Sequence, residues 1–272
     1  MQKIFLGTCI FAIAALLMPM SVQSQEVVEV KGVTGIGVIV GRISFEDAKR
    51  EALNQAKIEA LRLAGVNEQL QSFEMLFRSE INNDFTEFFS SDIHAELRGA
   101  VKHYSLVSTE TKTNPQSNLP YIEVTINATV ILYSNGPDPA FNVKVEGIKA
   151  IYNENEYLTF SIISTKDCYL NIFGISDSYT SLLYPNKWEK FKLIEAGKKV
   201  SFPMGRVDYP LTKGGKSPEI TRAVFVFTKE PIGYLNYVDE EEQNTTSEEI
   251  FSWIYSIMPD QRNAVYQVFT VR

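Results

Sequence analysis

A cluster of turn-forming residues near the middle of the chain separates two regions with different residue patterns. Residues 134–139 read Ser-Asn-Gly-Pro-Asp-Pro, a composition that interrupts helices and strands. Before this cluster the sequence predicts helices mixed with strands, and after it a series of short strands. We therefore expect a linker at residues 135–139, between one domain at 27–134 and a second at 140–272.

The first region begins with a β-prone stretch and continues with a marked helix signal. Val27–Val40 is rich in valine and isoleucine and predicts a strand interrupted by glycines. Ser44 and Asp47 have the spacing of a helix capping box, and Gly65 stands where such a helix would end. Between them, small residues recur at every fourth position: Ala48, Ala52, Ala56 and Ala60. Such a row lets a helix lie close against a sheet.

The remainder of this region predicts another helical segment and two strands. Asn67–Phe89 carries leucine, isoleucine and phenylalanine at helical spacing. Ala100–Thr111 and Tyr121–Tyr133 are β-prone, and the second alternates apolar with polar residues. Asn114–Pro120 supplies the turn between them. This order predicts a two-layer α/β domain, in which a long alanine-rich helix lies on a small sheet.

Three segments of this region carry a resemblance to a known family. They are the helical run SFEDAKREALNQAKIEALRLAG, then LRGAVKHYSLVSTETK at Leu97–Lys112 and YIEVTINATV at Tyr121–Val130. Together they resemble the N-terminal domain of flagellar assembly protein T and related small envelope lipoproteins, over residues 30–133. The resemblance implies a periplasmic assembly or docking module without catalysis. Nothing else in the chain points to flagella, so that role is not carried over.

The second region is a succession of short β-prone segments separated by turn residues. These segments are Phe141–Tyr152, Tyr157–Ser164, Cys168–Ile175, Ser181–Tyr184, Lys199–Phe202 and Ala223–Thr228. They predict a mostly antiparallel β-sandwich. Thr246 or Ser247 is expected to cap a short helix, and Ala264–Val271 to form a closing strand. The fold class expected for the whole chain is therefore α+β.

This second region also resembles a known family. The resemblance rests on three runs: YLTFSIISTKDCYLNIFGISDSYTSLLYPN at Tyr157–Asn186, EAGKKVSFP at Glu195–Pro203 and AVFVFTKEPI at Ala223–Ile232. They resemble domain-of-unknown-function family 4384, whose pattern includes an L-[FY]-P-N box and an A-G turn. Leu183–Asn186 and Ala196–Gly197 match these two features. The resemblance implies a β-sandwich module of exported or surface proteins, without an established activity.

The first 25 residues have the pattern of a cleaved signal peptide. A basic start at Lys3 precedes an apolar run at Ile4–Met18, and small residues follow at Ser21–Gln25. We expect cleavage near Ser24, and a location in the periplasm or on the cell surface. The apolar run is shorter than the roughly 20 residues that span a bilayer, and no later segment is more apolar, so no integral membrane span is expected.

The charge of the chain narrows the choice of partners. The formal net charge is −7, and loss of Lys3 with the signal peptide makes it −8, from 25 basic and 33 acidic residues. We find no Lys/Arg cluster in the sequence, and an acidic chain without one argues against nucleic acid, and against an anionic membrane surface, as a partner.

Several motifs resemble catalytic or metal sites without fulfilling their requirements. The glycines of Gly35–Gly41 fall within the predicted strand instead of the strand-to-helix turn that a nucleotide site needs. His94 and His103 do not have the i,i+4 spacing of helical metal ligands. The contiguous acids Asp239–Glu242 cannot all face one ion. Cys168, the sole cysteine after cleavage, is expected to be a small buried residue. We expect no cofactor, no metal and no catalytic residue.

The L-Y-P-N box is the strongest candidate for a binding site. Its residues, with a neighbouring tryptophan, are Leu183, Tyr184, Pro185, Asn186 and Trp188. One interpretation is structural: Leu183 and Tyr184 pack inside, and Pro185-Asn186 opens a turn. The other is a recognition edge, at which Tyr184 and Trp188 present aromatic surface to a partner.

Three functions follow as hypotheses. The first is an exported, non-catalytic module that docks other envelope proteins. The second is a module that binds a carbohydrate or cell-wall glycan through Tyr184, Trp188 and Trp253. The third is a hydrolase whose catalytic residues the sequence spacing does not reveal. A flat apolar patch favours the first, an aromatic pocket the second, and convergent carboxylates with shifted pKa values the third.

Overall fold

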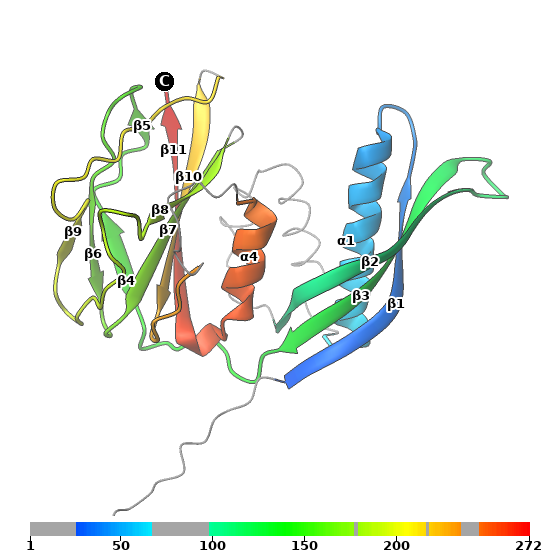
Figure 1. Ribbon diagram of the computed structural model, residues 1–272, viewed down its shortest axis with the longest axis horizontal. Coiled ribbons are helices and arrows are strands. Elements are labelled where there is room, and N and C mark those ends of the chain that lie inside the picture. The colour runs from blue at the N-terminus through cyan, green and yellow to red at the C-terminus, as the bar shows by residue number, and fades with distance from the viewer. Residues whose placement is uncertain (1–25, 67–97, 177–178, 216–217, 235–244) are drawn as a thin grey trace, which may run out of the picture.

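The structure is a computed structural model that describes residues 26–66, 98–176, 179–215, 218–234 and 245–272. The chain is rich in strands, which form three sheets within these residues. Figure 1 shows four layers: sheet β1-β3-β2, a helical layer with α1 and α4, a five-stranded sheet, and a small outer sheet β4-β6-β9. This architecture agrees with the predicted α+β class.

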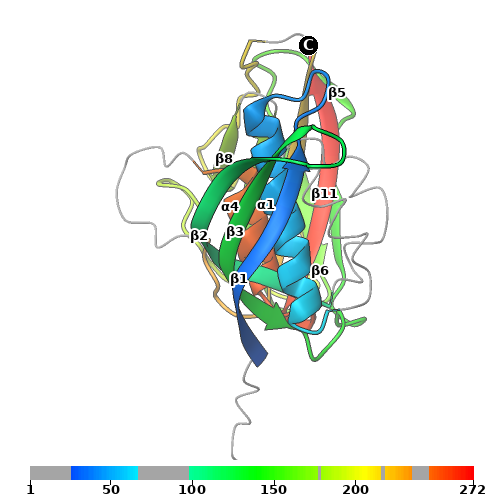
Figure 2. The same ribbon diagram turned by 90° about the vertical axis from the view of Figure 1, so that its right-hand side faces the viewer.

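The first sheet is antiparallel and consists of β1 (Glu26–Val38), β2 (Gly99–Thr113) and β3 (Pro120–Leu132), with β3 in the centre. The alternation predicted for β3 is present, and every second residue from Ile122 to Val130 is buried. In Figure 2 the other face of this sheet is turned to the viewer, with α1 and α4 behind it. The sheet therefore has an inner face that packs on helices and an outer face that none of the described elements covers.

Helix α1 (Phe45–Leu63) begins after Ser44, which forms the predicted capping box with Asp47. The alanines of α1 lie against glycines on the inner face of β1. A Cβ atom on Gly35 would lie 2.0 Å from the backbone oxygen of Ala52, and one on Gly37 would lie 1.8 Å from that of Ala48. Only glycine allows so close an approach of helix and strand backbones, which confirms a structural role for these two glycines.

Two further sheets form the second region. Their strands are β4 (Val143–Glu146), β5 (Ile151–Tyr152), β6 (Phe160–Ser164), β7 (Tyr169–Ser176), β8 (Thr180–Tyr184), β9 (Val200–Phe202), β10 (Glu219–Thr228) and β11 (Arg262–Val271). The larger sheet has the order β5-β11-β10-β7-β8, and its β5–β11 pair is parallel. The single strand predicted at Phe141–Tyr152 was wrong. Gly147, at φ 98°, turns the chain from β4 in the small sheet to β5 in the large one.

Aromatic side chains fill the space between these two sheets. Phe160 of β6 stacks on Phe202 of β9, with ring centroids 5.1 Å apart, and meets Phe225 of β10 edge-to-face at 5.0 Å. All three rings belong to one buried cluster, which also includes Leu170 and Phe269. The two sheets therefore pack face to face over a common core.

Helix α4 (Ser247–Ser256), followed by the 3-10 turn η2 (Pro259–Gln261), joins the two regions. Thr246 caps α4, as predicted. The fully buried Ile250, Phe251 and Ile254 share one apolar cluster with α1, β3, β7 and β10. An ion pair between Lys57 of α1 and Glu248 of α4 adds a polar link. The helix that follows the sandwich strands thus also covers the first sheet.

The predicted linker is held in place by ion pairs. The Asp138 carboxylate accepts hydrogen bonds from Lys166 and Lys229, each at 2.6 Å. These bonds hold the pKa of Asp138 well below its usual range. The domain boundary at residues 135–139 remains a prediction, since the apolar cluster around α4 spans both sides of it.

Some predictions fall outside the described residues. They are the signal peptide at 1–25, most of the helical segment Asn67–Phe89 with His94 beyond it, and the acidic run Asp239–Glu242. Within the described parts of the chain, neither helix has the length and apolar character needed to cross a bilayer.

Candidate functional site

The L-Y-P-N box begins in the edge strand β8, whose last two residues are Leu183 and Tyr184, and its tyrosine lies inside the sandwich. Tyr184 is fully buried, and its ring meets Phe202 edge-to-face at 5.2 Å. Its hydroxyl donates a hydrogen bond to the backbone oxygen of Lys190 at 3.0 Å. Burial raises the pKa of Tyr184 to about 12. The tyrosine therefore stabilises the fold and presents no ring surface to a partner.

Asn186 shapes the turn that follows. Its Oδ1 atom accepts hydrogen bonds from the backbone N–H groups of Trp188 and Glu189, at 3.0 and 2.9 Å. Its Nδ2 group donates to the backbone oxygen of Leu183 at 2.9 Å. An asparagine that bonds backbone groups on both sides fixes the conformation of a turn. Leu183 and Pro185 are half-buried beside it.

Glu189 is a central residue of this loop that the sequence analysis missed. Its side chain is almost completely buried. Its carboxylate accepts hydrogen bonds from the Tyr209 hydroxyl, the Met204 backbone N–H and, at 2.9 Å, the Asn186 amide. Burial and the hydrogen bond to Glu189 raise the pKa of Tyr209. The sequence held one signal for it: Asn186 stands three residues before Glu189, the spacing at which two residues face each other across a tight turn.

Trp188 is the predicted site residue that the structure presents to solvent. Its side chain is 67% exposed, although hydrogen bonds fix Asn186 and Glu189 on either side of it. The Lys187 ammonium lies 4.2 Å from the centroid of the indole ring. The five predicted residues thus divide into four that build a rigid turn and one that the turn displays.

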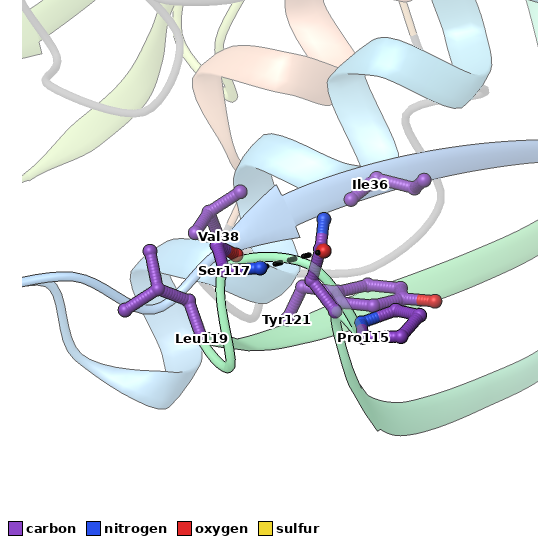
Figure 3. Close-up of a pocket in the computed structure, with 7 residues that line it drawn as sticks. Ile36, Val38, Pro115, Ser117, Leu119 and Tyr121 are labelled. Carbon is purple, nitrogen blue, oxygen red and sulfur yellow. Dashed lines mark hydrogen bonds between the residues drawn. The ribbon is translucent and has the colours of Figure 1, made fainter.

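A second candidate surface lies at the opposite end of the molecule and was not predicted. Figure 3 shows a pocket where β1 ends beside the β2–β3 hairpin; its volume is about 270 Å³. We name it the hairpin-end pocket; its lining residues are Ile36, Val38, Asn114, Pro115, Ser117, Leu119 and Tyr121. The Asn114 side chain accepts a hydrogen bond from the Ser117 backbone N–H at 3.2 Å, which braces the loop.

The strand beside this pocket also has a free edge within the described chain. The Ile39 N–H group bonds the Pro120 oxygen at 2.9 Å. Because backbone groups alternate in direction along a strand, those of Val38, Ile36 and Thr34 point away from β3. Among the described strands, β3 alone pairs with β1. Ile36 and Val38 therefore offer apolar side chains to the pocket and backbone groups to an added strand.

Apolar exposure continues beyond the pocket into the loop that leads to α1. Ile36 is 50% exposed and Val38 45%, and Val40, Ile43 and Phe45 have similar exposed fractions. Exposed apolar residues scattered singly are normal, whereas a contiguous group marks an interaction site. The sequence held one signal: if Gly35 and Gly37 face the helix, then Ile36 and Val38 must face outward.

The other sequence candidates form no site within the described residues. His103 lies exposed on β2. Cys168 is a buried free thiol, as predicted, and burial raises its pKa. No group of three or more histidine, cysteine, aspartate or glutamate residues is arranged to hold a metal ion in the described ranges.

Comparison with known families identifies one similarity. Residues 151–229 match the family described as Domain of unknown function (DUF4384). This supports the resemblance seen in the second region, and the matched range includes the L-Y-P-N box and the buried Glu189. No curated protein matches the chain. The family match thus covers the segment from β5 to the end of β10.

Proposed function

We propose that the protein is an exported, non-catalytic module that docks another envelope protein at the hairpin-end pocket. The observation that carries this proposal is the coincidence of an apolar pocket with a free strand edge on the same two residues, Ile36 and Val38. Strand addition uses both features, because backbone bonds supply affinity and a pocket for alternate side chains supplies specificity.

The partner segment that fits is an extended chain carrying an aliphatic or aromatic side chain. Its backbone would pair with Thr34, Ile36 and Val38, and its apolar side chain would enter the pocket beside Tyr121. The outer face near the pocket also carries Glu110 and Glu123, both paired with Lys112. Because these charges are already paired with each other, we expect the apolar pocket to contribute most of the binding free energy.

Two further considerations support this function. We propose that the first region, in which α1 packs on the sheet β1-β3-β2, is a two-layer assembly domain related to the N-terminal domain of flagellar assembly protein T. The signal pattern at Met1–Gln25 supports export to the periplasm or cell surface. The β-sandwich would then serve as the second half of an assembly module.

In-cell photocrosslinking tests the proposal. A photoreactive residue replacing Val38 should capture one dominant envelope protein, identified by mass spectrometry. The same residue at Arg62, exposed on α1, is the control and should not capture it. Val38→Lys should abolish capture from a reporter at Leu119, whereas Thr34→Lys, on the same face of β1 outside the pocket, should weaken it less. Equal capture from Val38 and Arg62 would contradict docking at the pocket.

The glycan hypothesis has a narrower basis. Of its three aromatic residues, Tyr184 is buried, and Trp253 packs on Phe173 and Tyr234 with centroid distances of 5.7 and 5.3 Å. Trp188 remains as an exposed ring that a sugar could contact. One exposed tryptophan supports this function less than the pocket and free edge support docking.

A further inference from the structure

We propose that the loop at residues 187–193 binds the headgroup region of an anionic lipid bilayer. We name it the lysine–tryptophan loop; it carries Lys187, Trp188, Lys190, Lys192 and Leu193 on the exposed side. This site is separate from the hairpin-end pocket and is independent of the docking function.

The lysines of this loop differ from most lysines of the molecule. Nine lysines form ion pairs with carboxylates: Lys57, Lys112, Lys144, Lys149, Lys166, Lys198, Lys199, Lys213 and Lys229. Lys187, Lys190 and Lys192 are exposed and pair with no carboxylate of the described residues. Six consecutive residues contain all three, so at most about 20 Å of chain separates them.

The acidic residues beside the loop are bonded to other groups: Glu195 pairs with Lys198, and Asp167 accepts a hydrogen bond from the Ala196 backbone N–H at 2.7 Å. Glu189 points inward, where Tyr209 and Met204 bond its carboxylate. Arg206, two residues after Met204 in the sequence, is exposed. Asp208 is the exposed acid that follows it. Residues 187–193 thus carry three exposed lysines and one buried carboxylate, Glu189, on a chain whose net charge is −7.

Apolar side chains accompany these charges, and the loop holds them in place. Trp188 is 67% exposed and Leu193 44%. The turn around Asn186 and the buried Glu189 fix the backbone of Trp188, so its exposure does not come from a loose loop. A rigid turn that keeps a tryptophan in water loses the stabilisation its burial would give, and it leaves this ring available to a membrane surface.

This combination of residues favours a lipid surface over a glycan. Tryptophan is enriched at the level of lipid headgroups, where its ring is amphipathic. Leucine enters the acyl boundary, and lysines reach anionic headgroups through their flexible stems. A sugar would stack on Trp188 but would make no use of Leu193. The overall acidity of the chain would argue against an anionic surface if the charges were spread evenly over the protein. They are not spread evenly, because three exposed lysines lie within residues 187–192.

Vesicle cosedimentation of the full chain tests the proposal. The probe is vesicles of equal parts phosphatidylglycerol and phosphatidylcholine, compared with phosphatidylcholine alone. The chain should bind the anionic vesicles and not the neutral ones. Replacing Lys187, Lys190 and Lys192 with glutamine should weaken binding about a hundredfold, since each lysine near an anionic surface contributes about fivefold.

Two matched controls separate the loop from general charge and aromatic content. A second triple variant replaces Lys144, Lys149 and Lys198, which are exposed but ion-paired, and changes the net charge equally. It should bind nearly as the unmodified chain does. Trp188→Ala should weaken binding and remove the vesicle-induced shift in tryptophan fluorescence, whereas Tyr157→Ala, at a 54% exposed tyrosine, should not.

Several outcomes would overturn the proposal. Equal binding to neutral vesicles would remove the role of headgroup charge, and equal loss in the two triple variants would remove the role of this loop. Failure to bind either vesicle would exclude the lipid surface. Loop-dependent binding to polygalacturonate in place of vesicles would assign the loop to an acidic glycan.

Discussion

The layer between α1 and β1 and the core of the sandwich bury apolar surface in opposite ways. In the first, four alanines and two glycines bring helix and strand backbones together with almost no side chain between them. In the second, phenylalanine and tyrosine rings hold two sheets apart and fill the space between them. Both regions exclude water, but one depends on the absence of side-chain atoms and the other on their presence.

This difference determines which substitutions each region tolerates. Protein interiors are packed as densely as organic crystals. A contact made by backbones has no rotamer that can move aside, whereas a cluster of rings can repack when one side chain changes shape. The α1–β1 layer should therefore be sensitive to added atoms, and the sandwich core to removed ones.

The largest effect is expected from removal of a ring in the sandwich core. Phe225→Ala should lower the free energy of unfolding by about 3–5 kcal/mol, because it leaves a cavity among buried aromatic residues. Urea unfolding followed by circular dichroism measures the change. Phe225→Leu, which retains most of the volume, should lose much less. A loss below about 1 kcal/mol for the alanine variant would show that the core collapses around the gap.

The second-largest loss of stability is expected when one carbon atom is added between α1 and β1. Gly37→Ala should lower the free energy of unfolding by about 3 kcal/mol, because its Cβ would lie 1.8 Å from the Ala48 oxygen and force helix and strand apart. Gly136→Ala is the control, since nothing lies within 4 Å of its Cβ position. Equal stability of the two variants would contradict this prediction, because it would show that α1 and β1 can move apart at little cost in free energy.

The smallest effect concerns Asp138, in the segment 135–139 that the sequence predicts to be a linker, and it depends on pH. Asp138 has its pKa lowered in the folded chain by bonds from Lys166 and Lys229. A carboxyl with a depressed folded pKa stabilises the fold above its unfolded pKa, about 3.9, and loses that contribution as pH falls through the folded value.

We therefore expect Asp138→Asn to reduce the urea midpoint at neutral pH, and the difference from the unmodified chain to shrink below about pH 4. Asp208→Asn, at an exposed aspartate, is the control and should give little difference at neutral pH. A gap between the Asp138→Asn variant and the unmodified chain that stays constant from neutral to acid pH would contradict a role for the ionised carboxylate.

Local signals in the sequence predicted local structure. The capping residues Ser44 and Thr246 marked the starts of both described helices, because capping chemistry involves residues close in sequence. The alternation along β3 predicted its buried face for the same reason. The division of the expected strand at Gly147 was missed, since a positive φ at a glycine is not visible in its neighbours.

Features formed by distant residues could not be predicted in this way. The hairpin-end pocket joins Ile36 and Val38 to residues 114–121, which only the pairing of β1 with β3 brings together. The burial of Glu189 depends on Tyr209 and Met204 from another loop. The charge count of the whole chain hid the unpaired lysines near Trp188, because it could not show which lysines were neutralised elsewhere.

The position of β11 within the large sheet has a consequence for biogenesis. This strand inserts between β5 and β10, although all other described strands precede it in the sequence. A polypeptide that emerges N-terminus first therefore holds β5 and β10 without their common neighbour until Arg262–Val271 is available. The sheet depends on contacts between residues far apart in sequence, which slow folding. Under the proposed export, this delay would keep the chain unfolded while it passes through a translocation channel.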